Sequence, residues 1–303
     1  MSTPASPRRG AASAVAAFFL WGLFPLYWKQ LSAVPALEVV AHRTAWGFAC
    51  LALWLLLRGG WGEAAALAGR PRTLAQLAAG ATLIGLNWLL YIWAVTHDHV
   101  MQASLGYYIN PLVNVLLGVA VLRERLSRGQ GLAVALAAAG VAVLTLGYGR
   151  FPWIALALAT TFGLYGLVRK TVAADAVVGL AWETAILAPA AVCYLVFLGA
   201  RGTGAFGATA GASALLVLGG AVTALPLALF AYGARALPLS TLGFIQYLSP
   251  SLQFLLAVLL YGEPFTAAHA VSFACIWAAL ALLTWDLRRR LPYGAGTQRQ
   301  TRT

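Results

Sequence analysis

Ten long apolar runs dominate the sequence, and each is about as long as a helix that crosses a membrane. The runs lie near residues 10–29, 36–57, 73–95, 101–122, 130–147, 152–168, 177–198, 212–231, 239–260 and 266–286. Crossing the hydrocarbon core takes about 20 apolar residues, and only helices or closed barrels satisfy every backbone polar group there. Because the runs lack the two-residue alternation of barrel strands, the sequence predicts an all-α integral membrane protein with ten transmembrane helices.

The amino-acid composition excludes a soluble protein. Of the 303 residues, 61% are hydrophobic and 9% are charged, whereas soluble domains carry about 25% charged residues. The net charge of +12 comes from Lys and Arg scattered over short connections and tails, so it does not indicate a nucleic-acid partner. Arg8 and Arg9 precede an apolar stretch too long for a signal peptide, and we expect the first span to remain as an anchor.

No cofactor or metal site is expected from the sequence. The three cysteines, Cys50, Cys193 and Cys275, lie inside apolar runs, which predicts buried free thiols without disulfides. The segment 97–99 reads His-Asp-His and places three potential ligands in a row. Because adjacent residues do not form a closed tetrahedral set, a solvated loop is the preferred interpretation.

Basic residues separate to one side of the ten-span arrangement. Sixteen of the 20 Lys and Arg residues fall in the tails and in alternate connections, three fall on the opposite side, and only Arg43 lies within a span. Cytoplasmic loops of membrane proteins carry the excess of basic residues, so both termini are expected in the cytoplasm. We predict a multi-pass protein of the plasma (inner) membrane with cytoplasmic tails at 1–9 and 287–303, the second of them basic.

An internal repeat links the fourth and ninth spans. The motif YINP at 108–111 is followed by Glu124 thirteen residues after its proline, and YLSP at 247–250 is followed by Glu263 at the same distance. The offset between the two motifs is 139 residues. An amide side chain stands three residues after each proline, and a Leu-Gly pair with an aromatic residue precedes each motif, the second at 242–244.

Two further segments repeat at nearly the same offset. GLFPL at 22–26 matches GLYGL at 163–167, and AHRTA at 41–45 matches AWETA at 181–185. The chain is therefore predicted to consist of two five-helix repeats, 10–147 and 151–286. Since five is odd, the second repeat begins on the opposite side of the membrane from the first, which makes the repeats inverted, as in many secondary transporters.

Three sequence elements carry a resemblance to a known family. FLWGLFPLYWK lies in the first span, EVVAHRTAWG in the second and GYYINPLVNVLLGVAVLRERLS in the fourth. With its two five-span halves, the chain resembles the drug/metabolite transporter superfamily, and most closely the RarD-type branch of EamA-domain proteins, over residues 10–286. The resemblance implies a ten-helix inner-membrane carrier with inverted halves and a central cavity. Superfamily members export metabolites or drugs or exchange sugar derivatives, and the RarD name is linked to chloramphenicol sensitivity.

Prolines near the middle of the repeated spans indicate where a substrate cavity could lie. We interpret Pro25, Pro111 and Pro250 as helix kinks that free backbone carbonyls. The candidate cavity residues are polar or aromatic side chains of the same spans and their neighbours: Trp21, Tyr27, His42, Arg43, Asn87, Tyr91, Tyr108, Asn110, Asn114, Gln246, Tyr247, Ser249 and Gln253. The alternative is that the prolines bend helices for packing and the amides hold neighbouring helices together.

Arg43 is the most unusual charged residue, because a guanidinium well inside a span costs at least about 2.5 kcal/mol. Two interpretations stay open: contact with the substrate or with a gate, and a structural ion pair with Glu38 near Lys29. The repeat counterpart of Arg43 is Glu183, on a helix of opposite direction. A direct bond between them would have to bridge about 10 Å or more of depth.

Carboxylates near span ends are the candidate gating or coupling groups. Glu38 and Glu183 lie deepest, and Glu183 is expected beside Arg169 or Lys170. His42 could carry a proton, with a hydrogen-bonded packing histidine as the alternative.

These features predict a secondary transporter that moves a small metabolite or drug-like molecule, as an exporter, through a central alternating-access cavity. The sequence contains no GxxxxGK[ST] motif for a nucleotide and no HExxH or GxSxG motif for an intramembrane enzyme. The alternatives are a non-transporting receptor or scaffold and an intramembrane enzyme. The expected partners are a small-molecule substrate, membrane lipid, and protons or another coupling solute, with the chain a monomer or homodimer.

Overall fold

The structure is a computed structural model that describes residues 7–123, 127–148, 151–236 and 245–290, and its regular structure in these ranges is entirely helical. In chain order the helices are α1 (Pro7–Gly22), α2 (Phe24–Trp28), the 3-10 turn η1 (Lys29–Leu31), α3 (Ala36–Arg58), α4 (Trp61–Ala68), α5 (Pro71–Thr96), α6 (Val100–Leu122), α7 (Arg128–Tyr148), α8 (Trp153–Thr171), α9 (Ala176–Arg201), α10 (Ala210–Ala236), α12 (Leu248–Leu255), the π turn η2 (Leu256–Leu260) and α13 (Ala267–Arg290). The predicted all-α class is therefore confirmed for these residues.

Each of the ten predicted spans contains a described helix, but the helices differ in length. Seven of them, α3, α5, α6, α7, α9, α10 and α13, are long and apolar enough to cross a membrane. The bent segment of α1, α2 and η1 makes an eighth when counted as one span. The apolar helices Trp153–Arg169 and Leu248–Leu260 are shorter. By length and composition the described chain thus supplies seven or eight spans, fewer than the ten expected.

Some predicted features lie outside the described residues. These are the chain ends 1–6 and 291–303, Glu124 and segment 242–244 of the repeat motifs, and the basic residues Arg125, Arg150, Arg299 and Arg302. Helix α1 begins at Pro7 and α13 continues to Arg290, so each helix extends into a predicted tail, 1–9 or 287–303.

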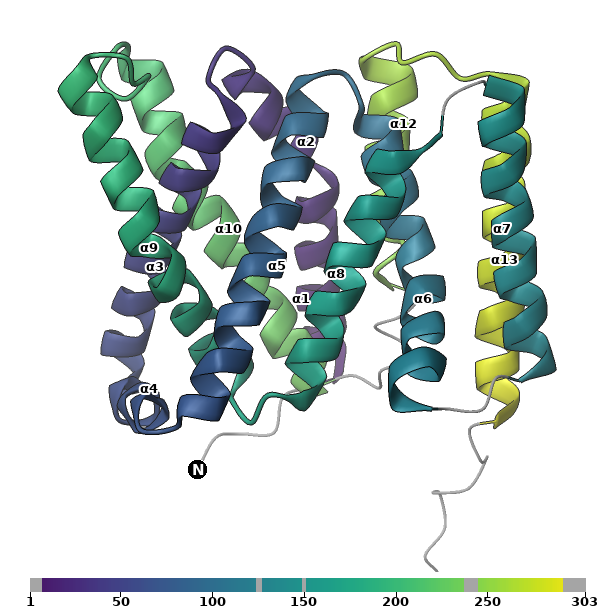
Figure 1. Ribbon diagram of the computed structural model, residues 1–303, viewed down its shortest axis with the longest axis horizontal. Helices are drawn as coiled ribbons and strands as arrows, with labels where there is room; N and C mark the ends of the chain where they lie inside the picture. Colours follow the sequence, from purple (N-terminus) through teal and green to yellow (C-terminus); the bar gives the residue numbers. More distant parts are fainter. Residues whose placement is uncertain (1–6, 124–126, 149–150, 237–244, 291–303) are drawn as a thin grey trace, which may run out of the picture.

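The helices run between two faces of the molecule and reverse direction from one to the next (Figure 1). The start of α1, the short helix α4 and the end of α13 lie at the lower face in this view, whereas α2 lies near the upper face. The two ends of the described chain are therefore on the same side, as the prediction for the termini requires.

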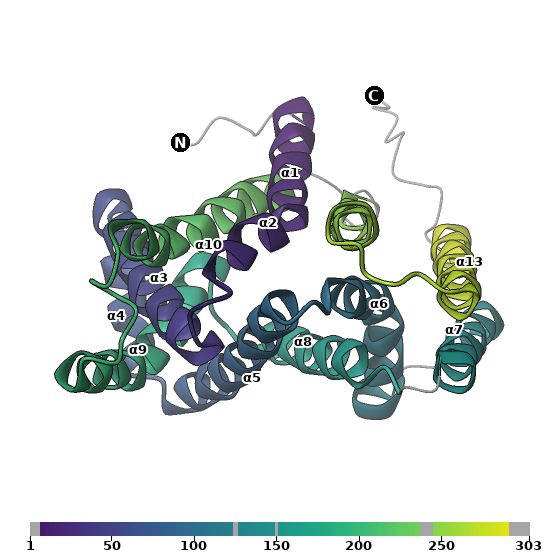
Figure 2. The same ribbon diagram turned by 90° about the horizontal axis from the view of Figure 1, so that it is seen from above.

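Packing divides the helices into groups around the middle of the molecule (Figure 2). Helices α7 and α13 pair at one end, and α3 packs against α9 and α10 at the other. Between these groups α5 packs against α8, α8 against α6, α6 against α12, and α12 against α1.

Glycines allow two of these contacts to be especially close. A Cβ atom at Gly106 of α6 would lie 2.8 Å from the carbonyl oxygen of Ala155 in α8. A Cβ atom at Gly220 of α10 would lie 2.5 Å from the carbonyl carbon of Trp46 in α3. Small residues at such crossings let helix backbones approach in a membrane, where packing rather than water exclusion drives association.

Large apolar side chains cover the outside of the bundle. Leu57, Leu146 and Leu259 are 77%, 85% and 77% exposed. Many exposed large apolar side chains are a liability in water but match the hydrocarbon of a bilayer. The exposed leucines therefore agree with the membrane location that the composition predicts.

The short helix α4 is an addition to the predicted arrangement. Gly59, with φ of 68°, ends α3 in the left-handed conformation, and the chain turns directly into α4. The indole N–H of Trp182 on α9 donates a hydrogen bond of 2.9 Å to the carbonyl oxygen of Ala64. A search for membrane-crossing runs overlooks α4 because its 8 residues are too few to cross.

Candidate functional site

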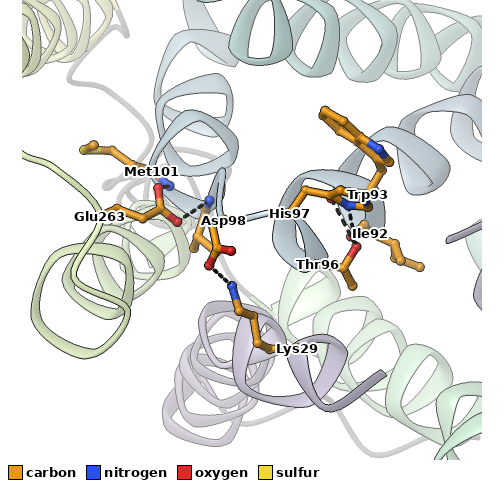
Figure 3. Close-up of polar contacts among 9 residues, drawn as sticks. Lys29, Ile92, Trp93, Thr96, His97, Asp98, Met101 and Glu263 are labelled. Atoms are coloured by element: carbon orange, nitrogen blue, oxygen red, sulfur yellow. Dashed lines mark hydrogen bonds and ion pairs between the residues drawn. The ribbon is translucent and has the colours of Figure 1, made fainter. Parts of the chain in front are cut away.

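Charged side chains from distant segments meet at the upper face (Figure 3). The Lys29 ammonium on η1 forms an ion pair with the Asp98 carboxylate in the loop between α5 and α6. Beside it, the two carboxylate oxygens of Glu263 accept hydrogen bonds from the backbone N–H groups of Val100 (2.6 Å) and Met101 (2.9 Å). These donors belong to the first turn of α6 and have no partner within the helix, so Glu263 caps α6 from the loop before α13.

Tyr261 joins this group through a cation–π contact. The Lys29 nitrogen lies 4.8 Å from the centre of the Tyr261 ring. Burial raises the pKa of the Glu263 carboxyl, whereas the two backbone N–H donors and Lys29 lower it. We call Lys29, Asp98, Tyr261 and Glu263 the upper cluster; it connects the segment after α2, the start of α6 and the loop before α13.

A second charged group lies where α8 ends and α9 begins, at the lower face. One oxygen of Glu183 lies 3.6 Å from a guanidinium nitrogen of Arg169, and the other accepts a 2.9 Å hydrogen bond from the Tyr165 hydroxyl. A Cβ atom at Gly80 of α5 would lie 2.8 Å from the Glu183 carboxylate, so α5 passes directly against it. We call Tyr165, Arg169 and Glu183 the lower cluster, and Arg169 is one of the two neighbours expected for Glu183.

Arg43 lies in aromatic surroundings on α3. Its side chain is 5% exposed, and the guanidinium carbon lies 4.2 Å from the ring centre of Trp88, 5.1 Å from Trp28 and 5.8 Å from Phe24. The Arg43 Nε has no hydrogen-bond partner. Within the part of the chain that the structure describes, no carboxylate lies within ion-pair distance of this guanidinium.

The structural pair considered for Arg43 and Glu38 is wrong. Glu38 is buried, and its carboxylate accepts a 2.6 Å hydrogen bond from the backbone N–H of Ala205 in the loop between α9 and α10. The physical reason is helix geometry: at about 100° per residue, side chains five positions apart point about 140° away from each other. Lys29, the other expected neighbour, is paired with Asp98 instead.

A pair of tyrosines adjoins the face of α5 that carries Trp88. Tyr91 is three residues after Trp88 on this helix, and its ring centre lies 5.7 Å from that of Tyr107 on α6 in an edge-to-face arrangement. The Tyr91 hydroxyl is buried and has no hydrogen-bond partner. Helices α3, α5 and α6 thus bring together a cation and an unpaired hydroxyl.

The repeated motifs of α6 and α12 face each other. The hydroxyl groups of Tyr108 and Ser251 are 2.6 Å apart, and the rings of Tyr108 and Tyr247 stack with centres 6.2 Å apart. The Ser104 hydroxyl donates a 2.7 Å hydrogen bond to the carbonyl oxygen of Pro250. The two motifs that the sequence relates therefore lie together in the structure.

Asn87 and Tyr27 contact other helices rather than an open site. The Asn87 amide on α5 donates hydrogen bonds to the carbonyl oxygen of Leu158 (3.0 Å) and the hydroxyl of Thr161 (2.9 Å), both on α8. The Tyr27 hydroxyl donates to the carbonyl oxygen of Leu215 on α10. These contacts favour the packing interpretation for both residues.

Gln253 joins α12 to α1. Its amide nitrogen lies 3.2 Å from the carbonyl oxygen of Trp21 and 3.2 Å from the hydroxyl of Ser249, while its amide oxygen is buried without a partner. The Trp21 ring packs against Phe18 and Phe230, with centres 5.1 Å and 5.6 Å apart.

The remaining candidates differ in their surroundings. His42 is buried, stacks on Phe206 at 5.1 Å between ring centres, and has no partner for either ring nitrogen. Asn110 is half-buried with an unpartnered amide oxygen, and Gln246 is half-buried. Asn114 is exposed, beside Gly163 of α8, and does not belong to the buried set.

The three prolines occupy different positions in their helices. Pro25 lies just after the 40° bend between α1 and α2, and Pro111 lies inside α6. Pro250 is the third residue of α12. Ile245 is helical and 246–247 form a turn, so Pro250, like Pro25, lies just after a break between helices; a proline fits in this first turn because the turn needs no N–H donor.

Sequence reasoning did not single out Tyr107 or Tyr261 as site residues. Their roles depend on contacts between helices that are far apart in the chain. The repeated glutamate after each proline was a signal for the upper cluster, because it marks Glu263. Of the described residues, no group of three His, Cys, Asp or Glu side chains could hold a metal ion.

Comparison with known proteins gives a consistent result. The model of the EamA-like transporter family matches residues 8–146. An uncharacterized transporter of Vibrio cholerae is 47% identical over 92% of this chain and 93% of its own length. The protein RarD of Escherichia coli is 45% identical over 92% of this chain and 95% of its own length. A more distant relative from Pseudomonas aeruginosa, named chloramphenicol-sensitive protein RarD, is 33% identical over 93% of this chain and 96% of its length.

A solved crystal structure with 22% identity has the same fold. It matches with a TM-score of 0.59 and covers 94% of this chain and 100% of its own. At this identity the match concerns the fold alone, whereas the relatives near 45% identity establish the family over nearly the whole chain. This chain belongs to the EamA-like transporter family and is a membrane transporter of the RarD type.

Proposed function

We propose that this chain is a secondary carrier that exports a small metabolite or drug-like molecule by alternating access between two inverted five-helix halves, 10–147 and 151–286. The observation that carries the proposal is an exchange symmetry in the helix packing. With α1, α3, α5, α6 and α7 as the counterparts of α8, α9, α10, α12 and α13, the packed pair α1–α10 corresponds to α8–α5. Likewise α6–α8 corresponds to α12–α1, and α3–α10 to α9–α5.

In the remaining large contacts, a helix packs against its own repeat counterpart, so exchanging the two halves leaves the pair unchanged. These contacts are α3–α9, α6–α12 and α7–α13. A protein built from two inverted, equivalent halves can adopt two arrangements related by a pseudo-two-fold axis in the membrane plane, in which the contacts of the halves are interchanged. This gives alternating access a structural basis without a further domain.

The two charged clusters at opposite faces support the same mechanism. The upper cluster joins the start of α6 to the loop before α13, and the lower cluster holds α8 and α9 against α5. We propose that breaking and forming these two contacts in turn opens one face and closes the other. Glu183 is a gating residue in this scheme, and Glu38 secures α3 to the loop before α10 at the upper face.

We propose that the lower face is cytoplasmic. It contains the start of α1 and the end of α13, and the tails and alternate connections that the ten-span prediction assigns to this side contain sixteen of the 20 basic residues of the sequence. Together with bacterial relatives that are named transporters, this supports a multi-pass protein of the inner membrane.

The test is solute exchange by the full-length protein in lipid vesicles. Chloramphenicol or one of a panel of small metabolites is loaded unlabelled into the vesicles, and the entry of the same solute in labelled form from outside is measured. A carrier accelerates labelled entry when the same solute is present on the opposite side, and a receptor or scaffold does not. Absence of such acceleration for every solute, with folded protein in the vesicles, contradicts the proposal.

A cross-link tests the alternation itself. Asp98→Cys and Tyr261→Cys, in a background with the three native cysteines replaced, lie on either side of Lys29. Bridging them with a reducible bifunctional thiol reagent should stop exchange, and reduction should restore it. Each single variant treated with the same reagent is the control. Unchanged exchange by the bridged protein would mean that the upper cluster does not open.

A further inference from the structure

The carboxylates that could neutralise Arg43 all contact other groups, both the one close to it in sequence and those at the upper face. Glu38 accepts a hydrogen bond from Ala205, Asp98 is paired with Lys29, and Glu263 caps α6. Glu183, the repeat counterpart, contacts Arg169 at the opposite face. Among the described residues the Arg43 guanidinium therefore carries a positive charge that no protein carboxylate neutralises.

Such a charge is costly inside a membrane protein unless something else balances it. The aromatic rings of Trp88, Trp28 and Phe24 attract the cation through their faces, but they offer no oxygen acceptor to its N–H groups. Arg43 Nε has no acceptor. The guanidinium is thus held in position with hydrogen-bonding capacity left over, as a binding site requires.

A second polar group lies on the same face of α5 as Trp88, whose ring centre is 4.2 Å from the guanidinium carbon. Tyr91 is three residues after Trp88, and its buried hydroxyl has no hydrogen-bond partner. A guanidinium and a hydroxyl together match an acceptor that has two oxygens. The adjoining indole and phenyl faces offer an apolar surface to the rest of such a molecule.

The number of available positive charges limits the type of anion. Phosphate carries nearly two negative charges and is usually bound by several basic groups or by a helix N-terminus. Lys29 of the upper cluster is paired with Asp98, and the N-terminus of α6 is occupied by Glu263. A single free guanidinium therefore fits a monoanion better than a phosphate.

We propose that Arg43 and Tyr91 bind the carboxylate of the transported solute, and that this solute is a small organic monocarboxylate with an apolar or aromatic body. The inference rests on the proposed carrier function, because it names the substrate class of that carrier. It also gives Arg43 a role in substrate binding instead of in a structural ion pair.

The first experiment measures stability without ligand. In detergent at low salt, Arg43→Met removes a charge that has no carboxylate partner, so the melting temperature of the ligand-free protein should not fall. Arg169→Gln is the control, because it removes a half-buried arginine that does contact a carboxylate, and its melting temperature should fall. A fall for Arg43→Met equal to that of the control would show a structural role and overturn the proposal.

The second experiment measures binding. Monocarboxylates from acetate to 3-phenylpropionate are each compared with the matching primary amide by the rise in melting temperature of the full-length protein. At least one acid should stabilise the wild type more than its amide. Arg43→Gln should weaken the apparent affinity for that acid by at least about tenfold, and Arg43→Lys should restore it only in part. If no acid exceeds its amide, or if Arg43→Gln keeps the preference, the proposal is wrong.

Chloride in place of gluconate in the buffer is the control for an adventitious ion. If chloride alone gives the full Arg43-dependent stabilisation and the acids add nothing, the site binds a halide and the carboxylate assignment fails. Vesicle exchange separates the two proposals. If the protein exchanges neutral or cationic solutes but binds no acid, the carrier function is supported and the anion site is contradicted. If it binds an acid through Arg43 but exchanges no solute, the anion site is supported and the carrier function is contradicted.

Discussion

Helix geometry decides which charged residues meet in this protein. Glu38 and Arg43 are close in sequence but lie on different sides of α3, and each finds its surroundings on another element. Glu183 and Arg169, by contrast, meet where α8 turns into α9. The unusual charges recognised in the sequence are therefore real features of the interior, but their partners depend on packing between helices.

Glu183→Gln should destabilise the protein by about 2 kcal/mol. The value is below the 3 to 5 kcal/mol expected for breaking a fully buried pair, because 17% of the Arg169 side chain remains exposed. Thermal unfolding in detergent measures the change. Tyr165→Phe is the control; it removes the 2.9 Å hydrogen bond but keeps the ion pair, so it should cost about 1 kcal/mol. Equal stability of Glu183→Gln and wild type would argue against a stabilising pair.

Asn87→Leu tests whether Asn87 is a packing residue. Loss of its hydrogen bonds to α8 should lower stability by about 1 kcal/mol, since interhelical hydrogen bonds in membranes contribute on average about 0.6 kcal/mol each. The KM and the solute preference in vesicle exchange should stay those of the wild type. A changed preference with unchanged stability would instead place Asn87 in contact with the substrate.

The same residue type has different effects in different parts of a helix. Pro111 lies within α6 and removes a hydrogen bond from its interior, whereas Pro250 lies in the first turn of α12. The π turn η2 follows α12 directly, and such turns often occur at functional positions. Helix α12 with η2 therefore departs from regular α-helical geometry near its end, whereas α6 continues as an α-helix through its proline.

Pro111→Ala and Pro250→Ala should therefore differ. An alanine at position 111 restores the donor to the interior of α6 and should reduce the exchange rate while the folded yield remains. An alanine at position 250 should leave the rate close to that of the wild type. The initial rate of vesicle exchange, normalised to folded protein, provides the comparison. Equal loss in both variants would show that the two prolines act alike despite their different positions.

The helices could be predicted from the sequence because length and apolar character determine them locally. The cap of α6 could not be predicted, because Glu263 and Val100 are 163 residues apart and every residue type except proline has a backbone N–H donor. Helix α4 is too short for a search based on crossing length. Arg43 was recognisable because charge within a span is rare, whereas the neighbouring Tyr107 looks like any other aromatic residue of an apolar run.

The whole molecule combines two sets of helices whose contacts correspond pairwise. The correspondence includes the pairs α3–α9, α6–α12 and α7–α13, which lie at both ends and in the middle of the bundle. The clusters at the two faces differ, however: the upper one contains Lys29 and two acids, the lower one a single arginine and a single acid. We expect the two faces to open with unequal energies.

Cysteine labelling should report the orientation of the whole molecule. Glu63 on α4 and Thr203 after α9 are exposed on opposite faces. In a background with the three native cysteines replaced, Thr203→Cys should react with an impermeant maleimide on intact cells, and Glu63→Cys only after permeabilisation. Reaction of both variants from the same side would contradict the alternating arrangement of helices.

The cap on α6 also affects the order of events during synthesis. The N–H groups of Val100 and Met101 enter the membrane long before Glu263 is made. At about 5 to 20 residues per second, the ribosome needs roughly 10 to 30 s to synthesise the intervening chain. During that time the start of α6 must rely on water or on other protein groups. Maturation of the first half therefore waits for almost the last segment of the chain, and a product released before residue 263 would leave α6 open to quality-control proteases.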